Sequence, residues 1–539
     1  MLIVGVGASA GGFEALRGVL TEMPAGSGIA FIVVFHLDAS AHTILLQSLP
    51  KGVALTFTEA KDGMSLEPDH VYIAPGRHLV SLQHGVIRLA PLEGNERQRA
   101  PIDHFLQSLA WDQKEHAVAV VLSGLGSDGA LGLKAVSDAG GMTIVQEPAS
   151  AQYDAMPQSA LDTGAVDHVL NPKSIPGELQ AYRDHIGRRA DEKELHREVL
   201  EALPQICESL LRETGHNFKH YKTSTLLRRT MRRLHVLRMS DVRQYVERLR
   251  SDGSEAQRLF QDLLVSVTAF FRDAEAFEAL SAKVLPRLFS NRGPRDKVRI
   301  WVPGCATGEE AYTLAMLLKE QIDSIASPPQ VHVFATDIDE HALAVARQGR
   351  YPAGIAEELT PERLERFFDK RGDQFHVKKE LRDLCLFSIH NLINDPPFSK
   401  LDLVSCRNLL IYLGAHLQQK LIPLFHFALN PEGYLFLGPS ENITGHGELF
   451  KPVDNKHRIS QRLSTTVRQG GFMVGYSKAP ASLPKPPNVP SDTDMDVYLV
   501  MQRIILDEFA PKCVVVREDG KIVCATGELE KYLSVAAGI

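Results

Sequence analysis

The chain has 539 residues, of which 44% are hydrophobic and 23% charged, and its formal net charge is −7. At roughly 100 to 200 residues per domain, this length predicts three or four domains, and the composition excludes bulk disorder and collagen-like repeats. The balance of 59 Lys and Arg against 66 Asp and Glu gives the whole chain no electrostatic case for binding nucleic acid.

Cysteine spacing and hydropathy indicate the compartment. The six cysteines lie far apart without a Cys-x-x-Cys pair, and no basic leader precedes the first apolar run. No stretch approaches the ~18 uninterrupted apolar residues of a membrane-spanning helix. We therefore expect a cytoplasmic protein with no disulfide framework, no metal site and no membrane insertion.

The first part of the chain, residues 1–172, alternates short apolar runs with helix-like stretches, which is typical of an α/β domain with a mostly parallel sheet. The strands predicted in it cover residues 2–6, 29–35, 70–74, 118–122 and 142–146. In such a domain, active groups are expected just past the carboxyl ends of the strands.

The middle of the chain changes character. Residues 173–199 are predicted to form a helical linker, and residues 200–290 a small all-helical domain with a connecting helix and many Arg and Lys between positions 219 and 238. A second α/β domain follows at 291–462, with a helix and a hairpin inserted at about 350–385. Its predicted strands cover residues 298–302, 331–336, 401–405 and 434–437.

The last part of the chain is predicted to be a Pro-rich linker, residues 463–495, followed by residues 496–539. This final piece is predicted to hold one helix and a hairpin around Asp519, and some forty residues make a poor core. We expect it to be the start of a truncated domain. The predicted fold class is α/β, with two doubly wound, mostly parallel sheets joined by a small all-α domain.

A glycine-rich turn at residues 5–12 is the first candidate site. A dinucleotide fingerprint requires G-x-G-x-x-G, but the next glycines after Gly7 are Gly11 and Gly12, and the second strand ends in His36 rather than in an acid. The same turn satisfies G-x-S-x-G with Ser9 as its serine, a pattern that exposes a nucleophile. Taken alone, the pattern is equally compatible with a structural turn.

Three residues with complementary chemistry follow three predicted strands. Ser9 follows the first strand, His36 the second, and Asp128 lies in the glycine-rich turn after residues 118–122. A serine nucleophile needs a base, and the base needs a carboxylate that fixes its tautomer. Each residue alone is more often structural, but the coincidence of the three predicts a Ser-His-Asp triad.

At these residues the first domain resembles the chemotaxis protein-glutamate methylesterases of the CheB type. The matching stretches are residues 7–12, 34–36, 74–78, 101–103 and 122–129. The resemblance implies hydrolysis of a glutamyl methyl ester, or deamidation of a glutamine, on a receptor helix by Ser9, His36 and Asp128. Stand-alone members carry a receiver domain ahead of the esterase, and since Ser9 leaves no room for one we expect no phosphorylation control within this chain.

The second candidate site begins at the strand, turn and helix start of residues 299–312. Glu309 and Glu310 in the first turn of the helix repel phosphates and favour a cationic or hydroxyl-bearing ligand. The next strand ends in Asp337, where doubly wound folds use an acid to hold ribose hydroxyls. S-adenosylmethionine offers both a ribose and a sulfonium cation. The alternative is that the glutamates cap the helix and that Asp337 forms a turn. This structural alternative is favoured for any one of these residues taken alone, but not for all of them together.

Residues 395–398, Asp-Pro-Pro-Phe, match a signature of nucleic-acid amino-methyltransferases, and the arginines between 228 and 238 could form a phosphate track. In those enzymes the motif ends the fourth strand, whereas here it precedes the strand at 401–405. We therefore interpret the proline pair as a loop-shaping element.

Residues 200–462 resemble the chemotaxis protein-glutamate O-methyltransferases of the CheR type. The matching stretches are residues 268–272, 308–310, 336–339, 391–392, 406–412 and 438–442. The resemblance implies contacts to S-adenosylmethionine from Ser266, Thr268, Arg272, Glu310, Asp337, Asn391, Leu392, Arg407 and Asn408. It also implies that Arg272 and Tyr412 face the reacting glutamate.

The same resemblance gives the basic helix near residues 228–233 a partner, the acidic cytoplasmic helices of a methyl-accepting chemoreceptor, with a solvated charged face as the alternative. The C-terminal piece is similar to the start of PAS-type sensor domains. The whole chain is thus predicted to be a bifunctional receptor-modifying enzyme that binds no nucleic acid. A catalytically silent sensory scaffold and, less favoured, a nucleic-acid methyltransferase are the alternatives.

Overall fold

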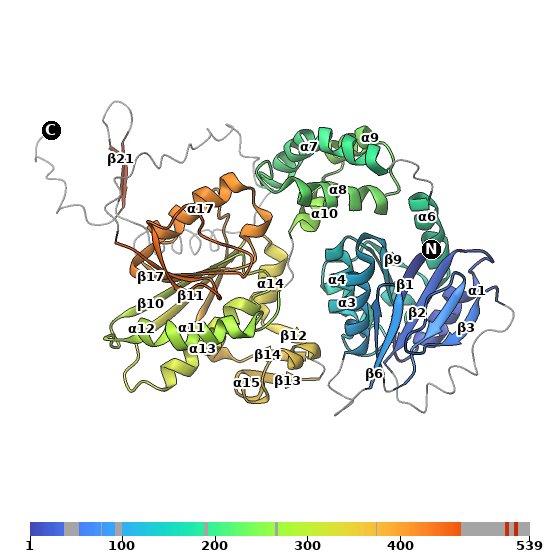
Figure 1. Ribbon diagram of the computed structural model, residues 1–539, viewed down its shortest axis with the longest axis horizontal. Helices are drawn as coiled ribbons and strands as arrows, with labels where there is room; N and C mark the ends of the chain where they lie inside the picture. Colours follow the sequence, from blue (N-terminus) through green and yellow to red (C-terminus); the bar gives the residue numbers. More distant parts are fainter. Residues whose placement is uncertain are drawn as a thin grey trace, which may run out of the picture.

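A computed structural model describes the chain over most of its length. The described residues are 1–36, 53–76, 78–91, 100–187, 192–264, 268–372 and 374–464, together with the backbone of 513–516 and 522–526. Figure 1 shows the first α/β domain in blue, a helical domain in green above it, and a second α/β domain running from yellow-green to orange.

The first domain is built on a parallel sheet of seven strands in the order β3-β4-β2-β1-β7-β8-β9. The strands are β1 (Leu2–Ala8), β2 (Ile29–Phe35), β3 (Thr56–Glu59), β4 (His70–Ile73), β7 (Ala117–Val121), β8 (Met142–Gln146) and β9 (His168–Leu170). The five strands predicted from sequence are confirmed, and β1 at the centre is the point where the chain switches from one side of the sheet to the other.

Helices cover both faces of this sheet. They are α1 (Gly12–Thr21), α3 (Pro101–Gln113), α4 (Ala130–Ala139), α5 (Ala155–Asp162) and α6 (Ile175–Gly187), and a separate hairpin is formed by β5 (His78–Gln83) and β6 (Val86–Pro91). A Cβ on Gly7 would lie 2.3 Å from Cγ2 of Ile102, so this glycine lets α3 pack directly on β1.

The predicted linker at 173–199 includes α6, which packs on the first domain. Ile175, Leu179 and Tyr182 of α6 are buried in the same hydrophobic cluster as the strands of the sheet. The first domain therefore continues past residue 172, because an amphipathic helix buries its apolar face wherever a core is available.

The helical domain consists of α7 (Glu192–Thr214), α8 (Thr223–Val236), α9 (Val242–Ser251) and α10 (Gly253–Leu263) around a core of its own. Asp241 and Asp252 accept hydrogen bonds from the first backbone N–H groups of α9 and α10, which explains where these two helices begin.

The second α/β domain contains a sheet in the order β15-β11-β10-β16-β17-β19-β18, parallel except at the β17, β19 and β18 edge. The strands are β10 (Lys297–Pro303), β11 (Gln330–Asp337), β15 (Cys385–Ile389), β16 (Leu401–Cys406), β17 (Leu429–Leu437), β18 (Phe450–Asp454) and β19 (Ile459–Arg462). Its main helices are α11 (Ala274–Lys283), α12 (Leu285–Phe289), α13 (Glu309–Asp323), α14 (Glu340–Gln348) and α17 (Ala415–Ala428).

The predicted insertion forms a small subdomain on this sheet. β13 (Phe368–Arg371) and β14 (Gln374–Val377) make the expected hairpin, and β12 (Arg350–Pro352) adds a third strand beside β14. The short helices α15 (Pro361–Phe367) and α16 (Lys379–Arg382) flank it.

Beyond residue 464 the structure describes two antiparallel strands, β20 (Cys513–Val516) and β21 (Ile522–Thr526), which flank the predicted hairpin turn. The Pro-rich linker and the helix predicted in the final piece lie outside the described residues. Within the described part, every helix is too short or too polar to cross a bilayer.

The basic helix of the middle domain, α8, departs from both sequence interpretations. Arg229, Arg232 and Arg233 are 1%, 3% and 2% exposed, and they pair with carboxylates of the same chain. A face that is predicted to meet a receptor or water is therefore buried in the protein, because acidic groups far away in the sequence neutralise it. Arg228, next to them, is exposed.

Candidate functional sites

The turns that follow β1 and β7 lie against each other and hold Ser9 at the edge of the first sheet. The Ser9 backbone N–H donates to the carbonyl of Ser123 at 3.1 Å, and Gly12 at the start of α1 donates to the carbonyl of Ser9 at 2.9 Å. A Cβ on Gly124 would lie 2.8 Å from Cβ of Ser9. Only glycine at position 124 therefore permits this approach, which the glycine-rich pattern of the sequence anticipates.

His36 and Asp128 meet at the same edge. His36 Nδ1 lies 3.2 Å from Asp128 Oδ2, and the His36 side chain is 39% exposed whereas that of Asp128 is 6% exposed. The Asp128 carboxylate also accepts from the backbone N–H groups of Ile102 at 3.1 Å and Asp103 at 2.9 Å, at the start of α3. The carboxylate is therefore fixed by backbone donors on one side and faces the imidazole on the other.

The hydroxyl of Ser9 is oriented differently from the sequence-based prediction. Ser9 Oγ donates to the backbone carbonyl of His36 at 3.0 Å, rather than to its ring. The backbone N–H of His36 in turn donates to the carbonyl of Ala8 at 2.9 Å, so the two strand ends are held together. Rotation about one side-chain bond redirects a serine hydroxyl, a change that takes picoseconds to nanoseconds at exposed positions.

Asp103 is a buried carboxyl beneath this site whose role sequence reasoning missed. It is 5% exposed and accepts from the backbone N–H of Gly132 in α4 at 2.6 Å. Burial, followed by the charge of the neighbouring Asp128, raises the pKa of Asp103 well above its ordinary value. Its position in the matching stretch 101–103 was the signal available in the sequence.

The second site is a pocket at the carboxyl edge of the second sheet, and it encloses about 1120 Å³ of empty space, part of it open to solvent. The predicted ligand-binding residues that line it are Thr268, Arg272, Glu310, Asp337, Asn391, Leu392, Arg407 and Asn408. Tyr412 lines the same pocket. Ser266, the remaining predicted contact, lies outside the described residues.

Two carboxylates from different elements converge in this pocket. Asp337, at the end of β11, accepts from the backbone N–H of Ala306 at 2.8 Å and of Asp339 at 3.0 Å, and burial raises its pKa. Glu310, in the first turn of α13, accepts from the Ser405 hydroxyl at 2.7 Å. Burial raises the pKa of Glu310 to about 7, opposed by the charge of Arg407.

Arg407 forms part of the pocket wall. Its guanidinium lies 4.7 Å from the ring centroids of both Phe277 and Phe436, donates to the carbonyl of Arg272 at 3.0 Å and pairs with Asp273 at 2.8 Å. These contacts fix the orientation of the side chain, since a guanidinium between two ring faces has little freedom to turn.

Glu441 holds the loop that carries Asn408, although sequence reasoning assigned it no role. It is 4% exposed, and its carboxylate accepts from the backbone N–H groups of Asn408 at 3.0 Å, Leu410 at 2.7 Å and Gly438 at 2.7 Å. The matching stretch 438–442 contained this signal. Tyr221 and His390 are further lining residues that the sequence did not indicate.

The Asp-Pro-Pro-Phe stretch shapes a loop beside the pocket, as predicted. The Asp395 carboxylate accepts from the Asn391 backbone N–H at 2.7 Å, and a ring nitrogen of His390 lies 2.9 Å from the carbonyl of Pro396. Phe398 packs against Trp301 with ring centroids 5.3 Å apart. The motif therefore positions Asn391 and precedes β16, unlike its place in the nucleic-acid enzymes.

In the part of the chain that the structure describes, no group of three or more His, Cys, Asp or Glu side chains is arranged to hold a metal ion.

Comparison with known proteins matches three segments of the chain to families. Residues 4–179 match the CheB methylesterase family, residues 201–264 the all-alpha domain of CheR methyltransferase, and residues 266–470 the SAM-binding domain of CheR methyltransferase. The crystal structure of the Thermotoga maritima CheB methylesterase catalytic domain is 31% identical, with 33% of this chain covering 97% of that one at a TM-score of 0.32.

Two curated relatives extend this comparison. Chemotaxis protein methyltransferase 1 of Pseudomonas aeruginosa is 32% identical over 240 residues, which are 44% of this chain and 86% of that protein. An uncharacterised 104.1 kDa protein of Rhodobacter capsulatus is 34% identical over 522 residues, which are 91% of this chain. The chain spans 54% of the length of that relative.

Proposed function

Because the chain belongs to the chemotaxis methyltransferase family and carries a CheB methylesterase domain ahead of its methyltransferase domain, we propose that it both methylates and demethylates glutamate side chains of chemoreceptors. The substrates are the cytoplasmic helices of methyl-accepting receptors, and the enzyme acts in the cytoplasm. Deamidation of receptor glutamines is a second reaction of the methylesterase site, since amide and ester hydrolysis pass through similar tetrahedral intermediates.

In the methylesterase reaction, Ser9 Oγ attacks the ester carbonyl while the His36 ring takes its proton. The proton then passes from His36 to the departing methanol, and water hydrolyses the acyl-enzyme by the same path in reverse. Asp128 accepts the Nδ1–H of His36 and keeps the ring oriented for these proton transfers. The distance of 3.2 Å between His36 Nδ1 and Asp128 Oδ2 supports this assignment. General-base assistance of this kind contributes about 10² to 10⁴ in rate.

The residues of the pocket fit S-adenosylmethionine. Asp337 and Glu310 are acceptors suited to ribose hydroxyls and to a cation, and two buried nitrogens in the described wall, His390 Nδ1 and Arg407 Nε, lack a hydrogen-bond partner. An unpartnered buried donor or acceptor costs about 1 to 3 kcal/mol, which a polar ligand would offset. When bound, the sulfonium supplies an electrophilic methyl group.

The chain contributes position rather than a strong base to the methyl transfer. A glutamate is already an anion at neutral pH, so Arg272 and Tyr412 need only orient its carboxylate toward the methyl donor. Holding two reactants in line can lower a barrier by about 7 to 11 kcal/mol. This explains why the pocket presents acceptors and a guanidinium without a dedicated general base.

The observation that carries the proposal is the convergence on one pocket of predicted residues from separate elements, among them Glu310 on α13, Asp337 on β11 and Arg407 after β16. The experiment is to incubate the chain with a receptor cytoplasmic fragment and methyl-tritiated S-adenosylmethionine. We expect incorporation of label into the receptor followed by release of volatile methanol. Failure to label any receptor fragment, with S-adenosylhomocysteine also failing to bind, would contradict the methyltransferase half.

A further inference from the structure

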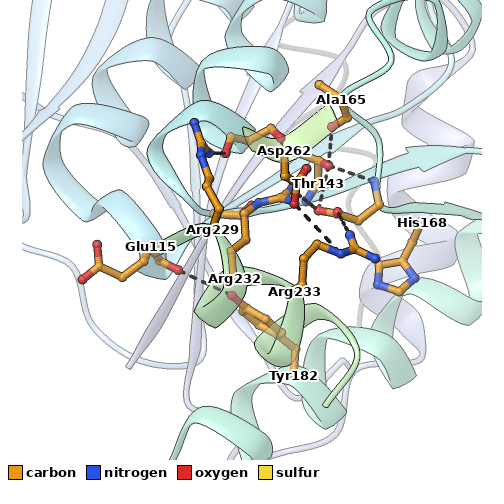
Figure 2. Close-up of polar contacts among 12 residues, drawn as sticks. Glu115, Thr143, Ala165, His168, Tyr182, Arg229, Arg232, Arg233 and Asp262 are labelled. Atoms are coloured by element: carbon orange, nitrogen blue, oxygen red, sulfur yellow. Dashed lines mark hydrogen bonds and ion pairs between the residues drawn. The ribbon is translucent and has the colours of Figure 1, made fainter. Parts of the chain in front are cut away.

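The buried arginines of α8 lie at a seam between the helical domain and the methylesterase domain. We call the seam the arginine latch and define it by Arg229, Arg232 and Arg233 on one side and by Ser137, Asp138, Gly141 and Asp167 on the other. Figure 2 shows the three arginines extending from α8 toward Thr143 on β8 and Ala165 in the turn ahead of β9.

Each arginine crosses the seam. Arg229 donates to the carbonyl of Ser137 at 3.0 Å, and Arg232 donates to the carbonyl of Gly141 at 3.1 Å. Arg232 and Arg233 also pair with the two oxygens of Asp167, at 2.7 Å and 3.4 Å. The α4 helix that ends at this seam begins two residues after Asp128, so the latch lies at the opposite end of a helix from the methylesterase site.

On their own side of the seam, the arginines are anchored in the helical domain. Arg232 pairs with Asp262 at 2.5 Å, and Arg233 forms a two-point contact with Glu255 at 2.9 and 2.7 Å. Both acids lie on α10. These contacts within the helical domain therefore fix the orientation of the arginine side chains that reach across the seam to the methylesterase domain.

The seam depends on charged groups rather than on apolar packing. Of the five hydrophobic clusters in the described residues, each lies wholly within residues 1–187 or wholly within 192–464. Polar interfaces between domains usually permit relative motion, whereas large apolar interfaces do not. The structure therefore gives the two parts independent cores joined by ion pairs.

The latch is also incompletely satisfied. Asp138 Oδ2 and the Nε and Nη2 atoms of Arg229 are buried without a hydrogen-bond partner in the described structure, and the nearest ion-pair approach between these side chains is 3.8 Å. A buried charge pair with unmade hydrogen bonds gains little, because its Coulomb attraction only partly offsets the loss of hydration. Water would satisfy these atoms if the seam opened.

The closed seam places the methylesterase domain beside the acceptor side of the methyltransferase pocket. The two residues ahead of α8 adjoin that pocket, since Tyr221 lines it and the Lys222 N–H donates to the carbonyl of Tyr412 at 2.9 Å. A Cβ on Gly354 would lie 3.6 Å from Cδ1 of Leu131 in α4. His341 Nε2 lies 3.3 Å from the carbonyl of Asp162.

Electrostatics agree with this placement. Burial raises the pKa of Tyr412, and the charges of Arg229 and Asp138 on the seam are among those that act on its hydroxyl. The described residues that line the pocket itself all come from positions 221–413. The methylesterase domain therefore stands beside Tyr412 without entering the space for the methyl donor.

We propose that the arginine latch holds the methylesterase domain across the approach of a protein substrate to Tyr412, and that methyl transfer to a receptor requires the latch to open. The inference rests on the proposed methyltransferase function and adds a regulatory contact to it. Because the donor pocket stays accessible, the closed enzyme binds S-adenosylmethionine but cannot present it to a glutamate on a bulky helical bundle.

The first test closes the seam covalently. Leu131→Cys and Gly354→Cys are introduced together in the full chain with Cys513 and Cys524 changed to serine, and the disulfide is formed with a mild oxidant. We expect the oxidised form to methylate a receptor fragment at least about tenfold more slowly than the reduced form. We also expect both forms to bind S-adenosylhomocysteine equally in calorimetry.

The outcomes separate the two proposals. Equal receptor methylation by the oxidised and reduced forms would overturn the latch while leaving the methyltransferase assignment intact. Absence of S-adenosylhomocysteine binding by both forms would instead overturn the proposed function. Each single-cysteine variant, treated with the same oxidant, controls for damage unrelated to the crosslink.

A second variant opens the seam without crosslinking. Arg232→Gln removes the contacts to Asp167 and Gly141, and we expect faster receptor methylation together with a larger radius of gyration in small-angle X-ray scattering. Arg197→Gln is the matched control, because Arg197 lies on α7 of the same domain and pairs with Glu194 on the surface. An unchanged rate and radius in a folded Arg232→Gln variant would also contradict the latch.

Discussion

Asp128 Oδ2 lies 3.2 Å from His36 Nδ1, and the carboxylate is held from behind by the backbone N–H groups of Ile102 and Asp103. The backbone donors fix the carboxylate at the start of α3, so it can orient the imidazole without moving. The geometry of this pair determines which nitrogen of His36 is available to a nucleophile.

Changing Asp128 to Asn tests this pair. An amide at position 128 can turn its NH₂ group toward the ring and favour the wrong tautomer of His36. We expect the rate of methanol release from a methylated receptor to fall by about 10⁴ while the fold is kept. Asp112→Asn on α3 is the control, since its carboxylate accepts from the backbone of Gly85 away from the site. A loss of less than tenfold would argue against the assignment of Asp128.

Replacement of Ser9 by Ala should separate the two activities. The variant lacks the proposed nucleophile, so methanol release should fall by roughly 10⁴ or more. Incorporation of label from tritiated S-adenosylmethionine should continue at the rate of the unaltered chain, because Ser9 is not among the residues lining the second pocket. Ser81→Ala in β5 serves as the matched serine control. Loss of both activities in a folded Ser9→Ala protein would refute the two-site assignment.

Asp337→Asn addresses the methyl-donor site. The backbone N–H groups of Ala306 and Asp339 donate to different oxygens of the Asp337 carboxylate, so the asparagine keeps an acceptor for one of them and removes the charge that would hold ribose hydroxyls. Hydrogen bonds to charged groups contribute about 1.5 to 3 kcal/mol, so we expect affinity for S-adenosylhomocysteine to weaken by about 10- to 100-fold in titration calorimetry. Asp296→Asn, in a turn ahead of β10, should leave the affinity unchanged. Unaltered binding by Asp337→Asn would rule out its proposed role.

The pKa of Glu310 predicts a pH dependence of donor binding. Burial raises this pKa to about 7, so the side chain is mostly neutral below that pH and mostly ionised above it. The sulfonium of S-adenosylmethionine is attracted to the ionised form, whereas the neutral thioether of S-adenosylhomocysteine is not. The ratio of the affinity for S-adenosylmethionine to the affinity for S-adenosylhomocysteine should therefore rise by roughly fivefold between about pH 6 and pH 8, since a partly screened charge pair contributes about 1 kcal/mol.

Glu310→Gln supplies the comparison for this pH dependence. The variant cannot ionise at position 310, so its affinity ratio should stay flat over the same range of pH. Titration calorimetry of both ligands at each pH measures the ratio directly. A slope that persists in Glu310→Gln would assign the titration to a different group.

The two sheets and the positions of the candidate residues could be predicted from sequence because they depend on local patterns. Buried parallel strands appear as short apolar runs, and the residues after them lie at one edge of the sheet whatever the details of packing. Ser9, His36 and Asp337 were found in this way. The glycines around Ser9 also carried local information, because close approach of two backbones leaves no room for a Cβ.

Supporting contacts were harder to predict because they join residues distant in sequence. Glu441 binds the loop at Asn408 from 33 positions away, and Asp103 supports Asp128 from 25 positions away. A glutamate or aspartate has the same local pattern whether its carboxylate faces water or accepts backbone N–H groups inside the protein. The hydrogen bond from the Ser9 hydroxyl to the carbonyl of His36 likewise joins residues that are distant in sequence, so the local pattern around Ser9 does not predict it.

Local patterns of the sequence were enough to predict the order of the domains, the inner strands of both sheets and the residue types at their carboxyl edges, because hydrophobic periodicity and glycine spacing are local properties of the chain. Tertiary structure alone decided where the charges of α8 lie. The local sequence of Arg229, Arg232 and Arg233 is the same whether these side chains face solvent or a carboxylate. Their contact with a carboxylate such as Asp167 depends on how two separately folded cores are placed against each other.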